Sequence, residues 1–369
     1  MLSLLAFGCG RIAFDPGDCA GFTLADAQVN LSSRLALQPS GATGAVTFTL
    51  SGPGVLLADG VTFVSPASRS TTVVTASDAV GCTTTATITT AGNAMFWISG
   101  TYNSVPTNEV WRSVDALTWT RIGSLPDARV NAAGAVFHDA FWLIGGSTDG
   151  GAIGQSNVWA SRDGVSWTDA SQFPVALTDA AAIGFTDRLW VIGGHGNPGG
   201  VWSTADGTTW QRESTLPSLF HGGELVVLDD RLLYMGGHDD SAYYDTEYAS
   251  ADGRNWTNIG SLPSQREFQS TTMRDGVITI AGGTDSVGNL QDSFTSRDAL
   301  TWTTGGALPA RRTYAALGCF VDRLYLIGGS DGGDVWSSND TASWTIEATT
   351  LPRPRWGGIL AQLTPDGGN

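Results

Sequence analysis

The sequence predicts an all-β protein built from repeats, because three features recur along it. Tryptophans recur every 42–48 residues, at Trp119, Trp167, Trp210, Trp256, Trp302 and Trp344. Eight residues before each stands another aromatic residue: Trp111, Trp159, Trp202, Tyr248, Phe294 and Trp336. Midway between the two lies an aspartate: Asp115, Asp163, Asp206, Asp252, Asp298 and Asp340. A period in the forties with Gly-rich, strand-like segments is typical of β-propellers, whose blades are four-stranded sheets around an axis.

Each copy divides into four expected strands, and the second strand ends in a glycine pair in five copies, beginning with Gly145-Gly146. The first copy starts at AMFWISG, which has the pattern of a second strand. RWGGILAQLT, near the end of the chain, is a first strand with nothing after it. We therefore expect a six-bladed β-propeller over residues 94–366, in which the C-terminal strand completes the first blade in a three-plus-one closure.

These glycine pairs, paired aromatics and LP-x-x-R links resemble kelch-type β-propeller repeats, including those of the galactose oxidase central domain. The strings SRDGVSW, SADGTTW and SADGRNW also resemble the sialidase Asp-box, shortened by one residue. In that family the box is structural, so the resemblance implies a turn-forming role for the six repeat aspartates. Calcium binding is disfavoured, because single carboxylates on separate blades cannot converge on an ion that needs about 6–8 oxygen ligands.

Residues 20–93 contain no tryptophan and alternate apolar residues with Thr and Ser in short runs, which predicts a small β-sandwich. The stretch TTVVTASDAVGCTTTATITT resembles the last hairpin of bacterial immunoglobulin-like domains. Cys82 follows its turn and Cys19 precedes the first strand, so an oxidising compartment would allow a disulfide between them. Cys319 lies in the apolar run YAALGCFV and is expected to be a buried free thiol.

Residues 1–19 form a candidate signal and tether. The opening MLSLLAFGCG resembles the end of a bacterial lipoprotein signal, which makes Cys9 the candidate for lipidation, although its short apolar run also fits a start lying upstream or an accidental likeness. The chain has no lysine, and its 19 arginines against 35 acids give a net charge of −16, which disfavours nucleic acid and anionic lipid as partners. We expect an exported protein, at the cell surface, as an outer membrane lipoprotein or in the periplasm, whose membrane contact is through that anchor.

The links between copies suggest a ligand-binding mouth. Arginine occupies the same link position in four consecutive blades: Arg129, Arg266, Arg312 and Arg355. Guanidiniums bind carboxylates through paired hydrogen bonds, so this arc favours an anionic ligand, although each arginine could instead brace the neighbouring blade. The two other blades contribute His195, His221 and His238, with His221 and His238 facing each other across a strand pair. Spacing fixes no third ligand, so no metal site and no cofactor is predicted.

Three classes of function remain open. The first is a non-enzymatic binding or scaffold protein for a protein or anionic glycan ligand, the role that kelch-like repeats imply. The second is a carbohydrate-active enzyme on an acidic sugar, similar to sialidases or to a kelch-type sialic acid epimerase, with Glu224 and Tyr314 as catalytic candidates. The third is copper oxidation as in galactose oxidase, whose copper ligands have no aligned counterpart here.

Overall fold

The computed structural model describes residues 27–30, 34–37, 45–52, 55–57, 60, 62–64, 70–79, 82–91, 94–150, 153–218, 220–320, 323–330, 332–351 and 355–363. The candidate lipidation site Cys9 and the disulfide candidate Cys19 lie outside these ranges. Every regular element within them is a β-strand, which confirms the all-β prediction. None of the described residues forms a helix with the length and hydropathy needed to cross a membrane. The described strands fall into two compact units, and the second is Ala94–Leu363.

The N-terminal unit contains two small sheets. One has the order β1 (Ala27–Asn30), β7 (Thr83–Ala91), β6 (Ser70–Ser77) and β3 (Thr47–Ser51); the other has β2 (Arg34–Ala36), β5 (Thr62–Val64) and β4 (Val55–Leu56). Phe63 of the second sheet is buried in one core with Phe48, Val74 and Ile88 of the first. Cys82, just before β7, is disulfide-bonded.

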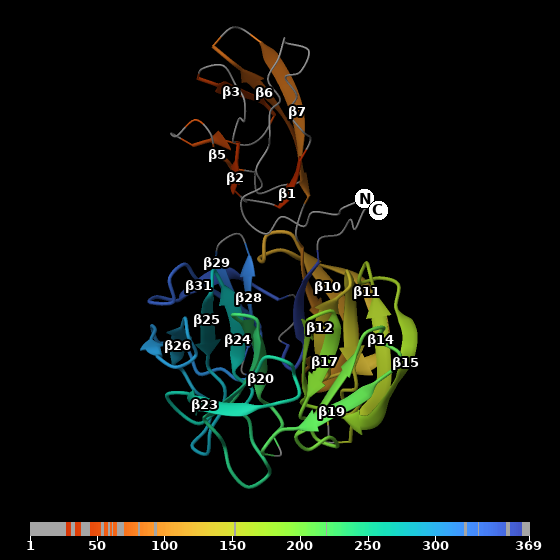
Figure 1. Ribbon diagram of the computed structural model, residues 1–369. Helices are drawn as coiled ribbons and strands as arrows, with labels where there is room; N and C mark the ends of the chain where they lie inside the picture. Colours follow the sequence, from red (N-terminus) through yellow and green to blue (C-terminus); the bar gives the residue numbers. More distant parts are fainter. Residues whose placement is uncertain are drawn as a thin grey trace. The chain divides into compact units, whose positions relative to one another are not determined.

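The second unit consists of antiparallel sheets that follow one another along the chain, six of them among the described residues (Figure 1). The first sheet comprises β8 (Ala94–Ile98), β9 (Thr101–Tyr102), β10 (Val105–Ser113) and β11 (Trp119–Arg129). The second comprises β12 (Ala133–Phe137), β13 (Ala140–Ile144), β14 (Gln155–Ser161) and β15 (Thr168–Leu177). The third comprises β16 (Ala181–Phe185), β17 (Arg188–Ile192), β18 (Gly200–Thr204) and β19 (Gln211–Thr215).

The other three sheets repeat this order. They are β20 (Glu224–Leu228), β21 (Arg231–Met235), β22 (Thr246–Ser250) and β23 (Thr257–Ser261); β24 (Ser270–Arg274), β25 (Val277–Ala281), β26 (Ser293–Ser296) and β27 (Thr303–Thr304); and β28 (Ala316–Phe320), β29 (Arg323–Ile327), β30 (Asp334–Ser338) and β31 (Thr345–Thr350). The last strand, β32 (Ile359–Leu363), returns to the first sheet and pairs with β8 from Ile359 opposite Ile98 to Leu363 opposite Ala94. Neighbouring first strands lie side by side from β12 through β16, β20, β24 and β28 to β32, and β32 lies beside β12. This repeated arrangement is compatible with a β-propeller.

Six backbone hydrogen bonds link the sheets where each link enters the next first strand. Asn131, Asp179, Gly222, Phe268, Tyr314 and Gly357, which we name the axial ring, each donate an N–H to the carbonyl of the preceding member, and Asn131 donates to Gly357. All six have positive φ, between 50° and 66°. Phe268 and Tyr314 are bulky residues that rarely adopt this conformation, so the surrounding structure must hold them in it.

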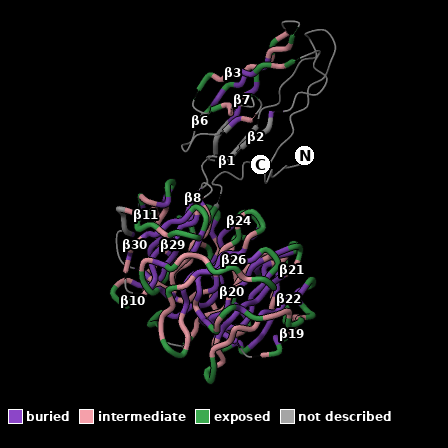
Figure 2. The backbone as a smooth tube through the Cα atoms, turned by 90° about the vertical axis from the view of Figure 1, so that its left-hand side faces the viewer, coloured by how far each residue is buried: buried purple, intermediate pink, exposed green. Residues whose placement is uncertain are grey.

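The hydrophobic core lies between neighbouring sheets. One cluster joins Phe185 and Trp190 of the third sheet to Leu225, Leu232 and Tyr248 of the fourth. Figure 2 shows buried segments along strands such as β20, β21 and β22, with exposed residues concentrated at the turns. Cys319, expected to be a buried free thiol, lies half-buried in β28 and is not disulfide-bonded.

The repeat aspartates lie in the turns between the third and fourth strands, on the side of the sheets that we call the turn face. In each turn the Asp Oδ1 accepts backbone N–H groups two and three residues later, such as Thr208 and Thr209 for Asp206 at 2.8 and 2.7 Å. The Ser or Thr two residues earlier donates its hydroxyl to the same oxygen, as Thr204 does to Asp206 at 2.9 Å. These are the hydrogen bonds of a turn-forming aspartate, and they hold the pKa of Asp206 well below its usual range.

Ending the chain before Arg355 should prevent cooperative folding of the second unit. The change removes β32, which covers β8, and Gly357, a member of the axial ring. Thermal unfolding followed by circular dichroism should lose its sigmoidal transition, whereas a chain that ends at Leu363 should melt like the parent. If the chain ending before Arg355 melted at the parental temperature, β32 would not be needed to complete the first sheet.

Asp206→Ala should lower the free energy of unfolding by about 1–2 kcal/mol near pH 7, because the amides of Thr208 and Thr209 lose their acceptor. Asp206→Asn keeps an oxygen acceptor and should cost less. The folded pKa of Asp206 is depressed, so its contribution is complete above the unfolded pKa of ~3.9 and is lost as pH falls through the folded value. Urea unfolding at pH 7 and pH 2 should therefore show the parent–Ala difference shrinking in acid; a constant difference would contradict this origin.

Candidate functional site

A cavity of about 120 Å³ lies inside the axial ring, at the end of the sheets where the links and the loops between second and third strands meet. We call this end the link face. Each sheet contributes two or three consecutive residues to the cavity wall, beginning with its member of the ring. The chain approaches the ring in the same way each time, because the second glycine of each pair donates its N–H to a link carbonyl of the next sheet, as Gly237 does to Arg266 at 2.8 Å.

The three predicted histidines lie together beside this cavity, on the third and fourth sheets. His221 and His238 exchange backbone hydrogen bonds of 3.0 and 2.9 Å, so they pair as the sequence indicated. His195 reaches the pair from the loop after β17, and its ring stacks on that of His221 with a centroid separation of 3.7 Å. Residues 195 and 238 both directly follow a glycine pair, so the repeat brings equivalent positions of two sheets together.

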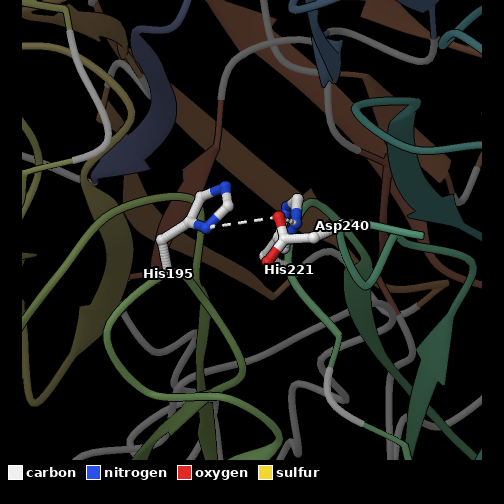
Figure 3. Close-up of side chains that lie close together, drawn as sticks. All are labelled: His195, His221 and Asp240. Carbon is white, nitrogen blue, oxygen red and sulfur yellow. Dashed lines mark hydrogen bonds and ion pairs between the residues drawn. The ribbon is translucent and has the colours of Figure 1, made fainter. Parts of the chain in front are cut away.

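Two carboxylates complete this cluster. Asp240 Oδ1, from the loop after β21, lies 3.3 Å from His221 Nε2 and 3.9 Å from His195 Nδ1 (Figure 3). Glu267 Oε2 lies 3.6 Å from the other ring nitrogen of His221, Nδ1. Glu267 occupies the same link position in its copy that His221 occupies in the copy before. These five residues, His195, His221, His238, Asp240 and Glu267, are the histidine–carboxylate cluster.

Burial shifts the protonation of this region strongly. It lowers the pKa of His221 to about 4, with the neighbouring His195 adding to the effect. Burial also raises the pKa of Glu267 to about 8, assisted by the charges of Asp179 and Asp240. Asp179, a member of the axial ring, likewise has its pKa raised by burial. Clusters of buried groups with shifted pKa values are a common property of functional sites.

The four link arginines do not form an exposed arc, so that expectation is corrected. Arg129, Arg266, Arg312 and Arg355 are at most 3% exposed. Each packs over the first repeat aromatic of the next sheet, with guanidinium-to-ring distances of 4.3 Å to Trp159, 5.0 Å to Phe294, 4.0 Å to Trp336 and 5.3 Å to Trp111. The geometry matches the bracing alternative.

A polar residue two positions before each of these aromatics meets the guanidinium. Arg266 Nη1 contacts Asp292 at 3.0 Å, Arg312 Nη2 contacts Asp334 at 3.5 Å and Arg129 Nη2 contacts Asn157 at 3.0 Å. Arg355 pairs with Glu109. In the two remaining sheets the link residues are Leu177 and Phe220, both fully buried, and the matching positions are Gly200 and Thr246. Arginine and its polar partner therefore occur together in this repeat, as one clamp.

The two catalytic candidates both line the axial cavity. Burial raises the pKa of the half-buried Glu224 to about 8. It also raises the pKa of Tyr314, whose ring stacks on Phe268 at 4.0 Å. A cavity of about 120 Å³ is small beside the roughly 300 Å³ or more of ordinary ligand pockets, so it admits water or an ion more readily than a sugar ring.

A second cavity, of about 470 Å³, lies on the turn face between the fifth and sixth sheets. Arg274, Arg297 and Asp298 line it together with several threonines. Arg274 Nη2 donates to the carbonyl of Asn339 at 2.7 Å and Arg297 Nη1 to that of Asp275 at 3.4 Å, so both guanidiniums already hydrogen-bond to backbone. A substitution in this turn-face cavity therefore serves below as a control for substitutions on the link face.

The sequence did not single out Asp240, Glu267 or Asp179. Alignment of the copies could have found Glu267, which shares the link position of His221. Asp240 follows His238 by two residues, and its role depends on a loop with left-handed backbone at Asp240, φ 68°, which no pattern predicts. No protein-family model matches this sequence, and no curated protein is significantly similar to it.

Arg312→Met should destabilise the protein by at least about 2 kcal/mol, because it leaves Asp334 without its guanidinium and removes the contact with Trp336. Arg311→Met is the matched control: Arg311 is exposed and bonds only the carbonyl of Asn289 among the contacts described, so its loss should cost below about 0.5 kcal/mol. Chemical unfolding of both variants measures the difference. Equal losses would mean that burial of Arg312 adds nothing to stability.

Proposed function

We propose that the second unit is a six-bladed kelch-type β-propeller with three-plus-one closure, and that the first is an immunoglobulin-like domain. The pairing of β32 with β8, the axial ring and the repeated clamp support this architecture. We further propose that the protein is exported and held at a surface through Cys9. The disulfide at Cys82 supports export, because disulfides persist mainly in oxidising compartments.

In this proposal the protein is a non-enzymatic binding or scaffold protein, and the link face takes a protein or anionic glycan ligand. One observation carries the assignment of the face. Some of the buried polar atoms that have no hydrogen-bond partner among the described residues lie at the cavity or in the cluster beside it: Asn131 Oδ1, Asp179 Oδ1, His221 Nδ1, Glu267 Oε2 and Gln269 Oε1. Such atoms are costly in a folded protein unless a ligand, ion or water satisfies them.

The burial of the link arginines changes how this ligand would be held. Recognition falls to side chains near the cavity that remain accessible, chiefly His195, Asp240 and Tyr243. Tyr243 is half-buried and its ring lies 4.5 Å from that of His238. Aromatic and imidazole rings offer flat surfaces for sugar rings and protein side chains, so they suit a binding surface whose four link arginines are buried.

The enzyme alternative, action on an acidic sugar, keeps one supporting observation: Glu224 has a raised pKa and shares a cavity with Tyr314. Two observations oppose it. The arginines that would hold the sugar carboxylate are buried in clamps, and the cavity is small. We therefore place the binding function first.

Binding of the full chain to an array of neutral, sialylated and uronic glycans and of purified surface proteins tests the proposal. Tyr243→Ala should weaken a ligand found in this way at least about tenfold, as expected for loss of a central aromatic contact. Arg297→Ala, in the turn-face cavity, should leave its affinity unchanged. The reverse result would move the ligand to the turn face, and turnover of sialosides that Glu224→Gln abolishes would establish the enzyme instead.

A further inference from the structure

His221 faces two carboxylates from opposite edges of its ring. Its Nε2 lies 3.3 Å from Asp240 Oδ1, and its Nδ1 lies 3.6 Å from Glu267 Oε2. Carboxylate oxygens accept hydrogen bonds, whereas a neutral imidazole carries a single N–H. Neutral His221 can therefore donate to only one of these two groups, and the tautomer that donates toward Glu267 leaves the Nε2 lone pair directed at Asp240 Oδ1.

In that tautomer the neighbouring imidazole does not relieve the contact between Nε2 and Asp240. His238 Nδ1, 3.5 Å from His221 Nε2, accepts the backbone N–H of Asp240 at 3.1 Å, so it has no proton to offer there. A cation on the Nε2 side removes the conflict, because it accepts lone pairs from the imidazole and from Asp240 together.

We propose that His195 Nδ1, His221 Nε2 and Asp240 Oδ1 bind a divalent transition-metal ion, with Zn²⁺ the best match to these donors. The three residues offer ligand atoms within 4.8 Å of one another. Tetrahedral zinc with bonds near 2.0–2.1 Å places its ligand atoms roughly 3.3 Å apart. The observed separations are 3.3 Å from His221 and 3.9 Å from His195 to Asp240, and the His195 ring, now stacked on His221, would have to turn for both imidazoles to face the same ion.

Glu267 is the positioning residue of this site. When Nε2 of a histidine binds a metal, its Nδ1 carries the proton and usually donates it to a carboxylate or carbonyl. His221 Nδ1 and Glu267 Oε2 are both buried, and neither has a hydrogen-bond partner among the described residues. In the metal-binding tautomer His221 Nδ1 carries a proton that faces Glu267 Oε2, and closing the 3.6 Å separation by a few tenths of an ångström would give both atoms a partner.

The site is fixed by backbone and open to solvent. His195 pairs with Thr178, and His221 with His238, through backbone hydrogen bonds, so the two rings have stable supports. The Asp240 side chain is 77% exposed, which gives an ion a path from solution. Three protein ligands leave a fourth position for water or for an oxygen of a ligand. Binding of a ligand oxygen at the fourth position rests on the proposed binding function, whereas binding of the metal ion does not.

Titration of the metal-depleted full chain, without an affinity tag, with Zn²⁺ by calorimetry tests this proposal, and Co²⁺ absorption reports the geometry. We expect one Zn²⁺ per chain and a Co²⁺ spectrum of tetrahedral intensity. His195→Ala and Asp240→Asn should each weaken Zn²⁺ at least about a hundredfold, and Glu267→Gln about tenfold, in line with the usual effect of outer-shell partners. The titration uses metal ions alone, so its outcome does not depend on whether the glycan and protein array identifies a ligand.

His138→Asn is the matched control. His138 stacks on Phe137 in a strand turn outside the cluster, and asparagine tolerates its positive φ of 48°. This variant should bind Zn²⁺ like the parent.

Parental binding by both His195→Ala and Asp240→Asn, or the absence of stoichiometric binding, would overturn the proposal. Loss of binding in His238→Ala with binding kept in His195→Ala would likewise overturn it and assign the ion to His221, His238 and Glu267. Near-ultraviolet circular dichroism without metal identifies variants that fail to fold, and Asp240→Asn, at an exposed position, keeps the test decisive.

Discussion

The axial ring of six backbone hydrogen bonds is the constraint on which the second unit depends. Each N–H can reach the preceding carbonyl because its residue adopts a left-handed backbone, which costs of order 1–3 kcal/mol at a non-glycine residue. Gly222 and Gly357 adopt this conformation without that cost, whereas Phe268 and Tyr314 are held in it by their mutual stacking at 4.0 Å. The chain must return to its beginning to supply Gly357, so the ring joins residues 131 and 357 into one cooperative structure.

The arginine clamps explain how such a ring is kept in place. The arginine of each clamp lies two residues before a ring member. Its guanidinium holds the link to the next sheet by contacting a polar side chain and the face of an aromatic ring. Two links have apolar residues instead, Leu177 before Asp179 and Phe220 before Gly222. The histidine–carboxylate cluster is built mainly at these two links and their neighbouring loops. Departures from a local rule often mark functional positions, and the three histidines of the cluster lie at or beside the two links that depart from the clamp.

The sequence was sufficient for the parts of the structure that repeat. Period and alternation predicted the sheets, and the aspartate spacing predicted turns whose hydrogen bonds the structure shows in every copy. The expected exposure of the arginines was wrong because link position alone says nothing of burial. The clamp could have been found by comparing each link residue with the residue two positions before the aromatic of the next sheet. That residue is Asp, Glu or Asn where the link has arginine, and Gly or Thr where the link has Leu177 or Phe220. Asp240 and Glu267 were beyond such reasoning, because their approach to His221 depends on loop conformation and on contact between sheets.

The distribution of charged side chains bears on ligand recognition. The chain has no lysine, so arginine is its permanently charged cationic side chain, and the four link arginines are buried inside clamps. These four guanidiniums are therefore not available on the link face, where the described residues near the axis include Asp179, Asp240 and Glu267, two of them with raised pKa values. The exposed carboxylate of Asp240 and the net charge of −16 disfavour an anion at this surface. A bound divalent ion would neutralise Asp240, bind His221 and offer a position to an anionic oxygen. Metal binding would thus reconcile an acidic link face with the anionic class of ligand that we propose for it.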